Sequence, residues 1–241
     1  MQASSPLPVV DVQSARLVLG IDTCGPSGSV ALGRLSILGG IKILGQIEME
    51  GRSYSATLVA AVRDLLAQAG ARVADLGCIV AVNGPGSFTG VRVGLSAAKG
   101  LAEPAQIPVV AVSRLEVLAA AAGVASSALD AHRHEVFLRL GGVRLEGREL
   151  LAGAHELAAI DLPRGPIAVC DEAAATLLQF AWPAAELQRG PAPAAADALK
   201  LGAGRIAARE FIDLALLDGH YLRRSDAEIF GEPVSASPRR P

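Results

Sequence analysis

Aromatic residues, net charge and cysteine are all scarce in this 241-residue chain. Rings make up only 3% of the residues although 51% are hydrophobic, so Ala, Val, Leu and Ile have to build most of the core. This apolar content excludes disorder for most of the chain. The formal net charge of −2 gives no overall electrostatic footprint for holding nucleic acid unaided. If RNA is involved, we expect a partner to hold it.

Disulfide scaffolds and targeting segments are also missing from the sequence. The three cysteines, Cys24, Cys78 and Cys170, lie far apart without a Cys-x-x-Cys pair, and their odd number favours reduced thiols. Residues 1–15 lack the basic start and apolar middle of a secretory signal, and no run reaches the roughly 18 apolar residues of a membrane span. We therefore expect a cytoplasmic protein without membrane contact.

A glycine-rich stretch, Gly84-Pro-Gly-Ser-Phe-Thr-Gly90, connects an apolar strand at 78–82 to a small-residue helix at 91–102. Glycine and proline favour a tight turn here. The amides of Ser87 to Gly90 fall where a helix start leaves donors unpaired, and such an end attracts anions. The spacing fits neither a Walker loop nor a Rossmann fingerprint. A phosphate site and a simple strand-to-helix connection both remain open.

The same stretch carries a resemblance to a known family. The run from Gly84 to Gly94, continued by Ala98-Lys-Gly-Leu-Ala102, resembles the signature of the TsaB family, also called YeaZ. That bacterial family belongs to the actin-like ATPase superfamily and helps make threonylcarbamoyladenosine in tRNA. The resemblance extends through Leu19 to Cys24, Leu129 to Ala131 and Tyr221 to Arg223.

The fold class that we expect is α/β, with two actin-like (ribonuclease H-like) lobes, each a mixed sheet of the five-stranded type flanked by helices. The pattern repeats a hairpin, first at 17–32 and again at 125–140. We assign residues 16–113 with about 210–230 to the first lobe, 114–209 to a smaller second lobe, and 1–15 and 231–241 to flexible tails. Further strands are expected at 41–49, 78–82, 107–113 and 167–171, helices at 54–69, 91–102, 114–123 and 194–209, and a connection at 183–193.

The resemblance implies where a nucleotide would lie if one bound. Actin-like enzymes flank a nucleotide with one hairpin carboxylate from each lobe, and Asp22 and Asp130 match these positions. The candidate phosphate or nucleotide contacts are Asp22, Thr23, Gly84, Gly86, Ser87, Thr89 and Asp130, with Ser27 near them. Asp22 as a simple turn cap is the alternative. Thr23 crowds the phosphate, and Cys170-Asp-Glu172 has no glycine where relatives place an adenosine loop. We expect no cofactor bound to this chain itself, although the complex with its partners can bind ATP or ADP.

Metal ligands are missing where the catalytic relatives have them. The resemblance places Arg114 and Leu118 where the TsaD type carries two histidines, and neither side chain can replace a neutral imidazole. The His132-x-His134 pair has no evident third ligand, so a solvated turn is the simpler interpretation. We therefore predict no metal site, no catalytic residue and no activity of the chain's own.

Two helices suggest a partner surface. The helix at 54–69 has a wider apolar arc than one core contact requires, and small residues recur along the next helix. In the TsaB family these helices meet the TsaD subunit, or a second copy when TsaD is absent. The residues that we expect in this interface are Tyr54, Leu58, Val59, Val62, Leu65, Arg92, Gly94, Ala97, Ala98 and Leu101.

The resemblance thus implies a non-catalytic subunit of a tRNA threonylcarbamoyltransferase complex. It would activate a TsaD-type subunit as its dimerisation partner, work with a TsaE-type ATPase and reach tRNA through the complex, or form a homodimer when alone. The alternative is an independent ATPase or small-molecule kinase that uses Asp22, Asp130 and the glycine loop.

Overall fold

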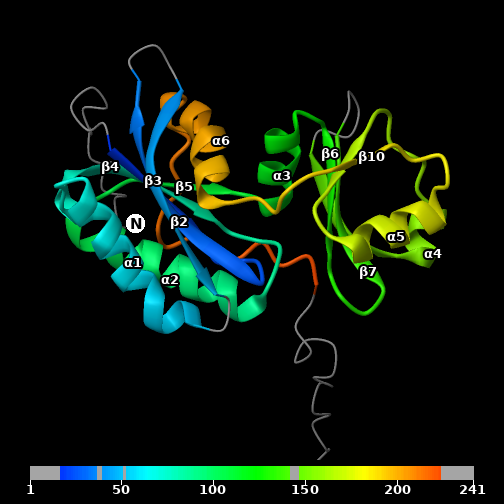
Figure 1. Cartoon of the computed structure of the whole chain (residues 1–241), viewed down its shortest axis with the longest axis horizontal. Coiled ribbons are helices and arrows are strands. Elements are labelled where there is room, and N and C mark those ends of the chain that lie inside the picture. The colour runs from blue at the N-terminus through cyan, green and yellow to red at the C-terminus, as the bar shows by residue number, and fades with distance from the viewer. Residues whose placement is uncertain (1–16, 37–39, 51–52, 142–146, 224–241) are drawn as a thin grey trace, which may run out of the picture.

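The chain folds into two lobes, each built on a five-stranded mixed sheet (Figure 1). The structure is a computed structural model that describes residues 17–36, 40–50, 53–141 and 147–223. The expected tails at 1–15 and 231–241 lie outside these residues. Within them, no helix combines the length and the apolarity that crossing a bilayer requires.

The first sheet has the order β3-β2-β1-β4-β5. The first three strands are antiparallel, whereas β4 and β5 continue parallel to β1. Parallel neighbours need a crossover connection, which here is the helix after β4. The bounds are β1 (Leu17–Asp22), β2 (Ser27–Leu35), β3 (Ile41–Glu50), β4 (Leu76–Val82) and β5 (Val109–Val112).

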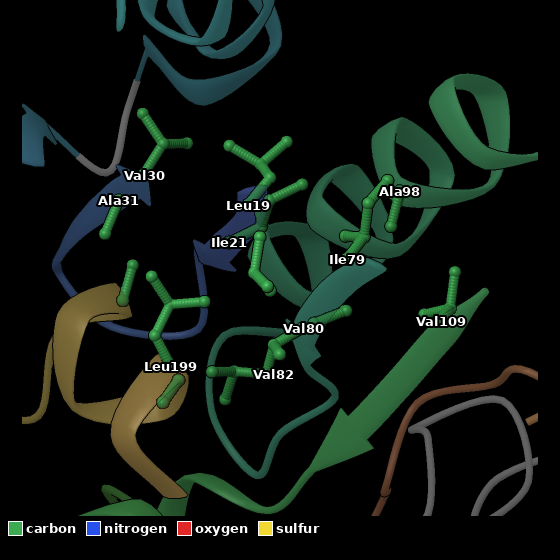
Figure 2. Packing of buried hydrophobic residues seen from close by; sticks show 14 of the residues in the cluster. Leu19, Ile21, Val30, Ala31, Ile79, Val80, Val82, Ala98, Val109 and Leu199 are labelled. Atoms are coloured by element: carbon green, nitrogen blue, oxygen red, sulfur yellow. The ribbon is translucent and has the colours of Figure 1, made fainter. Parts of the chain in front are cut away.

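Helices cover both faces of the first sheet. On one face lie α1 (Tyr54–Gln68) and α2 (Phe88–Ala105), with a short 3₁₀ helix, η2 (Val73–Asp75), between them in the chain. On the other face lies α6 (Ala195–Ala207). Figure 2 shows Ala98 of α2 and Leu199 of α6 on opposite sides of the strands. The core consists mainly of Ala, Val, Leu and Ile, as the scarcity of rings predicted.

The second sheet has the order β10-β9-β6-β7-β8. Its hairpin of β6 and β7 is antiparallel, and β9 joins β6 in parallel. The bounds are α3 (Arg114–Ala122), β6 (Ser126–Asp130), β7 (Glu135–Leu140), β8 (Arg148–Gly153), α4 (Ala154–Ala158), β9 (Ile167–Val169), α5 (Glu172–Ala181) and β10 (Leu187–Arg189).

The expected fold class and both hairpins are confirmed, but the second half of the chain differs in detail. The sequence did not predict β8, α4 or α5, and β10 lies inside the expected connection at 183–193. The helix expected within the second lobe, α6, packs on β1, β2, β4 and β5 of the first sheet. Its inward residue Leu199 fills space beside Gly20 and Gly33 of that sheet. The first lobe therefore takes two segments of the chain, one from β1 to β5 and one that begins with α6.

Candidate functional site

A cleft of about 1090 Å³ lies between the two lobes. Its wall combines the turn after β1, the glycine loop before α2, the start of α3, the β6–β7 turn, the start of α5 and the last described segment. Residues from distant parts of the sequence therefore meet here. They include Cys24, Gly86, Ser87, Phe88, Arg114, Asp130, His132, Cys170, Asp171, His220, Tyr221 and Arg223.

A buried ion pair lies at the junction of the lobes. Nε of Arg114, the first residue of α3, lies 3.5 Å from Oδ2 of Asp22, the last residue of β1, and their side chains are only 7% and 1% exposed. Oδ1 of Asp22 accepts the amide of Cys24 at 2.9 Å. Nε of Arg114 has no hydrogen-bond partner. Burial lowers the pKa of Arg114, but Asp22, Cys24 and Cys170 together raise that pKa by more, so the guanidinium stays protonated.

Two thiols lie close to this pair. Burial raises the pKa of Cys24 well above its usual value, and the nearby Asp22 carboxylate raises it further. Burial also raises the pKa of Cys170, against the lowering effect of Arg114. Because the thiolate is the reactive form, both cysteines are poor nucleophiles in this setting. The expectation of reduced thiols agrees with the structure, in which all three cysteines are free.

The glycine loop packs directly on the backbone that follows β1. A Cβ on Gly86 would overlap the carbonyl of Cys24, and one on Gly90 would overlap the carbonyl of Thr23. The Ser87 amide donates to the Cys24 carbonyl at 2.8 Å, and the Thr23 hydroxyl donates to the Gly90 carbonyl at 2.7 Å. The Gly90 amide turns to the Ser87 side chain. Two of the four amides expected at an anion are thus already bonded, which favours the interpretation as a tight connection.

The second lobe contributes two more carboxylates to the cleft. Asp171 accepts the amides of Ala174 and Asp130, at 2.7 and 3.0 Å, and so caps α5. Asp130 holds its own turn, because it accepts the amide of His132 at 2.8 Å and lies 2.9 Å from Nδ1 of the same residue. His134 belongs to that turn as well. Over the described ranges, no group of three or more His, Cys, Asp and Glu is placed to hold a metal ion.

These contacts do not fit a metal-bound nucleotide. The carboxylate that would hold the cation, Asp22, already faces the guanidinium of Arg114. The loop that would approach the adenosine instead presents Asp171 as a helix cap with Glu172 after it. A phosphate there would meet the Asp171 carboxylate, which caps α5, and the Glu172 carboxylate, which already pairs with Arg189, so we derive no reaction step through a nucleotide on this chain.

The structure divides the expected interface residues into buried and exposed sets. Six of the ten lie in the chain's own core, because α1 and α2 use those positions to pack on the first sheet: Tyr54, Leu58, Val62, Leu65, Gly94 and Ala98. Gly94 packs so closely on the Thr23 hydroxyl that a Cβ would overlap it. Ala97 and Leu101 are half-buried, whereas Arg92 is exposed and Val59 is 67% exposed.

A different set of residues forms the outer face of the two neighbouring helices. On α1 the exposed positions follow each other at three- or four-residue spacing, as they do on α2. We call this surface the docking face and define it as Ala56, Val59, Arg63 and Ala67 of α1 with Phe88, Arg92, Ser96 and Gly100 of α2. Small and apolar residues dominate it, and nothing lies within 4 Å of a Cβ built on Gly100.

Other contacts at the lobe junction were not predicted. Glu149 of β8 is 5% exposed and takes hydrogen bonds from three segments, and Tyr221 stacks near Phe88. No local motif in the sequence predicts the hydrogen bonds of Glu149. Tyr221 belongs to the run from Tyr221 to Arg223 that carries the family resemblance, but that run does not predict its contact with Phe88. Arg139 lies opposite Glu149 in the β7–β8 pair, whereas only the pairing of the lobes brings Ser113 and His220 within reach of Glu149.

Comparison with known proteins places the fold. The family model of TsaD, tRNA N6-adenosine threonylcarbamoyltransferase, matches residues 46–156. An uncharacterised protein of Mycobacterium tuberculosis is 32% identical over 216 residues, which cover 88% of this chain and 93% of that protein. The tRNA threonylcarbamoyladenosine biosynthesis protein TsaB of Bacillus subtilis is 38% identical over 127 residues, which cover 51% of this chain and 54% of that protein.

Solved structures agree with these relatives over most of the chain. YeaZ from Pseudomonas aeruginosa superimposes with a TM-score of 0.69 at 27% identity, and covers 86% of this chain and 100% of its own. A second structure from the same organism, described as similar to peptidase YEAZ, gives 0.70 at 28% identity. Both the sequence relatives and the two-lobed architecture lead to one assignment. The chain belongs to the TsaB (YeaZ) family.

Proposed function

We propose that this chain is a non-catalytic subunit required to form threonylcarbamoyladenosine next to the anticodon of tRNA. It acts as the dimerisation partner and activator of a TsaD-type catalytic subunit in the cytoplasm. Its relatives named for tRNA threonylcarbamoyladenosine biosynthesis support the pathway.

The buried pair of Asp22 and Arg114 is the observation that carries the non-catalytic role. Arg114 begins α3, where the family resemblance places a metal-ligand histidine of the catalytic type. Its side chain instead turns to Asp22 at the lobe junction, and a guanidinium that stays protonated cannot ligate a metal. The same pair disfavours the alternative of an independent ATPase or kinase, because it takes the place of the cation in the cleft.

The docking face supports the partner role. It presents Val59 and the ring of Phe88 to solvent, and its charged members are Arg63 and Arg92. Arg63 already pairs with the adjacent Asp64 at 2.8 Å. Small residues at Ala56, Ser96 and Gly100 let the backbone of another helix approach closely. The face therefore suits an antiparallel or crossing pair of helices from the TsaD-type subunit, with a second copy of this chain as the competing occupant.

The deciding experiment is reconstituted tRNA modification. Purified TsaC-, TsaD- and TsaE-type proteins from one source are incubated with tRNA and labelled threonine, with and without this chain. A third reaction contains this chain in place of the TsaD-type protein. We expect incorporation only when both this chain and the TsaD-type subunit are present.

Two results would contradict this function. Incorporation that is indifferent to the chain removes the requirement for it. Incorporation when the chain replaces the TsaD-type subunit assigns it a catalytic centre of its own. ATP turnover by the chain alone, lost in an Asp22→Asn variant, would restore the kinase alternative.

A further inference from the structure

The last described segment runs between the two lobes. We call residues 217–223 the strap, and Figure 1 shows this orange-red end of the chain leaving the first lobe toward the second. Leu217 anchors it in the core of the first lobe at 1% exposure. The amide of His220 donates to the carbonyl of Asn83, just after β4, at 2.7 Å. The start of the strap is thus fixed beside the glycine loop.

The strap also contacts the second lobe through one histidine–carboxylate contact and one ion pair. Nε2 of His220 lies 2.9 Å from Oε2 of Glu149 on β8, and Arg223 pairs with Glu135 on β7. Glu149 is a buried junction, because it also accepts the Ser113 hydroxyl at 2.7 Å and pairs with Arg139 at 2.8 Å. Ser113 is the residue between β5 and α3. Movement of the strap therefore changes the anchoring of β7 and β8.

Between His220 and Arg223, Tyr221 contacts Phe88, the first residue of α2. Its ring centroid lies 5.2 Å from that of Phe88, at a tilt of 44°. The guanidinium carbon of Arg92 lies 3.8 Å from the Phe88 centroid. Phe88 and Tyr221 remain 44% and 39% exposed. Arg92, Phe88 and Tyr221 thus form a continuous stack at the edge of the cleft.

This stack is the end of the docking face. Phe88, Arg92, Ser96 and Gly100 follow one another at four-residue spacing along α2, and all four are exposed. A partner helix lying on this row therefore covers Phe88 and Arg92. Contact with the partner would then reach the strap through Tyr221, whose neighbours His220 and Arg223 contact the second lobe.

We propose that the strap couples occupancy of the docking face to the stability of the second lobe, with Tyr221 as the linking residue. The proposal rests on the function proposed above, because its ligand is the TsaD-type subunit docked on α1 and α2. Docking removes Phe88 and Arg92 from solvent and reduces their freedom, which holds Tyr221 in place. His220 and Arg223 then keep their pairs for a larger fraction of the time, and β7 and β8 open less often.

Amide hydrogen exchange of the full chain, alone and with the purified TsaD-type subunit, tests this coupling. In the wild type we expect slower exchange at α1 and α2, where the partner sits, and also at β7 and β8. The second effect should be about fivefold, the weight of one aromatic contact of about 1 kcal/mol. Strand β8 is well suited to the measurement because it lies beside β7 at the edge of the sheet formed by the described strands.

Variants separate the strap from the docking face itself. Tyr221→Ala should keep the partner-dependent protection of α1 and α2 but lose that of β7 and β8, and Tyr221→Phe should restore it. Arg223→Gln, at the other end of the link, should give the same selective loss at β7. Leu216→Ala is the matched control, because Leu216 precedes the strap and is 73% exposed; it should behave as wild type.

Each outcome bears on a different part of the argument. Protection of α1 and α2 without any change at β7 and β8 in the wild type overturns the strap and leaves the docking face intact. Undiminished protection of β7 and β8 in Tyr221→Ala also overturns it, since the signal would travel by another route. If α1 and α2 gain no protection in the wild type, the docking face itself is wrong and the strap falls with it.

Discussion

The ion pair of Asp22 and Arg114 makes the sharpest prediction about stability. Removing one member of a buried pair leaves an uncompensated charge and typically costs about 3–5 kcal/mol. The separation of 3.5 Å and the lack of a hydrogen bond at Nε of Arg114 place this pair at the lower end of that range. We therefore expect Arg114→Met to lower the free energy of unfolding by about 3 kcal/mol. At an m-value of about 2 kcal/mol/M, the urea midpoint would fall by about 1.5 M.

A double-mutant cycle isolates the pair from side effects. Asp22→Asn keeps an oxygen that can accept the Cys24 amide, so it removes the charge with little else. Combining it with Arg114→Met removes both charges, and the double variant should return to within about 1 kcal/mol of the wild type. Arg63→Met is the control, because Arg63 pairs with Asp64 on the surface at 75% exposure and should have little effect.

Urea unfolding at neutral pH provides the assay, followed by two probes. Far-UV circular dichroism reports the whole chain, whereas fluorescence of Trp182, the sole tryptophan, reports the second lobe. The midpoints from the two probes should coincide in the wild type if the lobes unfold together. Single-variant costs that add within about 0.5 kcal/mol in the double variant would refute the coupling and, with it, the claim that the pair joins the lobes.

Three further predictions concern packing, pH and docking. Gly94→Ala should lower the melting temperature, because the added Cβ would overlap the Thr23 hydroxyl. Gly100→Ala, in open space on the same helix, should leave the melting temperature equal or higher, and equal decreases in the two variants would contradict the close packing at Gly94. Burial raises the pKa of Glu149, but hydrogen bonds from His220, Ser113 and Arg139 outweigh burial and lower that pKa below its usual 4.5. The stability that these bonds contribute is therefore lost as the pH falls below about 4.5. Urea midpoints between about pH 3 and 6 should depend less on pH in Glu149→Gln than in the wild type, and an unchanged pH profile would refute this. Val59→Asp should weaken binding of the TsaD-type subunit at least tenfold in titration calorimetry while leaving the melting temperature unchanged. Leu216→Asp is the control, because Leu216 is exposed but lies outside the docking face, and it should leave the affinity unchanged. Equal affinities for the two variants would remove Val59 from the interface.

Short-range patterns in the sequence were enough for the strands of the first lobe. Continuous apolar runs bounded by turn residues predicted β1, β2 and β4, and the left-handed conformation of Gly123 ends α3 as expected. The glycine-rich run also identified the family, because close contacts with the backbone of Thr23 and Cys24 leave little choice of residue at Gly86 and Gly90. The strands and the helix end depend on residues near in sequence, and the glycine-rich run depends on its contact with the backbone that follows β1.

The tertiary structure alone decided which faces of the helices are free. Apolar periodicity gave α1 a wide hydrophobic arc, but it could not show that α1 and α2 bury Leu58 and Gly94 against their own sheet and expose Val59 and Phe88. The same limit applies to α6, whose small inward residues suit either lobe and which packs on the first.

Long-range electrostatics were equally invisible to local patterns. The family resemblance predicted that Arg114 stands where the catalytic type has a ligand. The sequence could not show that its guanidinium lies beside Asp22, 92 positions earlier in the chain, or that Glu149 accepts hydrogen bonds from three segments. The sequence by itself thus determined the strands of the first lobe, the hairpin turns and the family, since these depend on local backbone preference and residue size. The ion pairs between the lobes, the docking face and the strap were decided only when folding brought distant residues within a few ångströms.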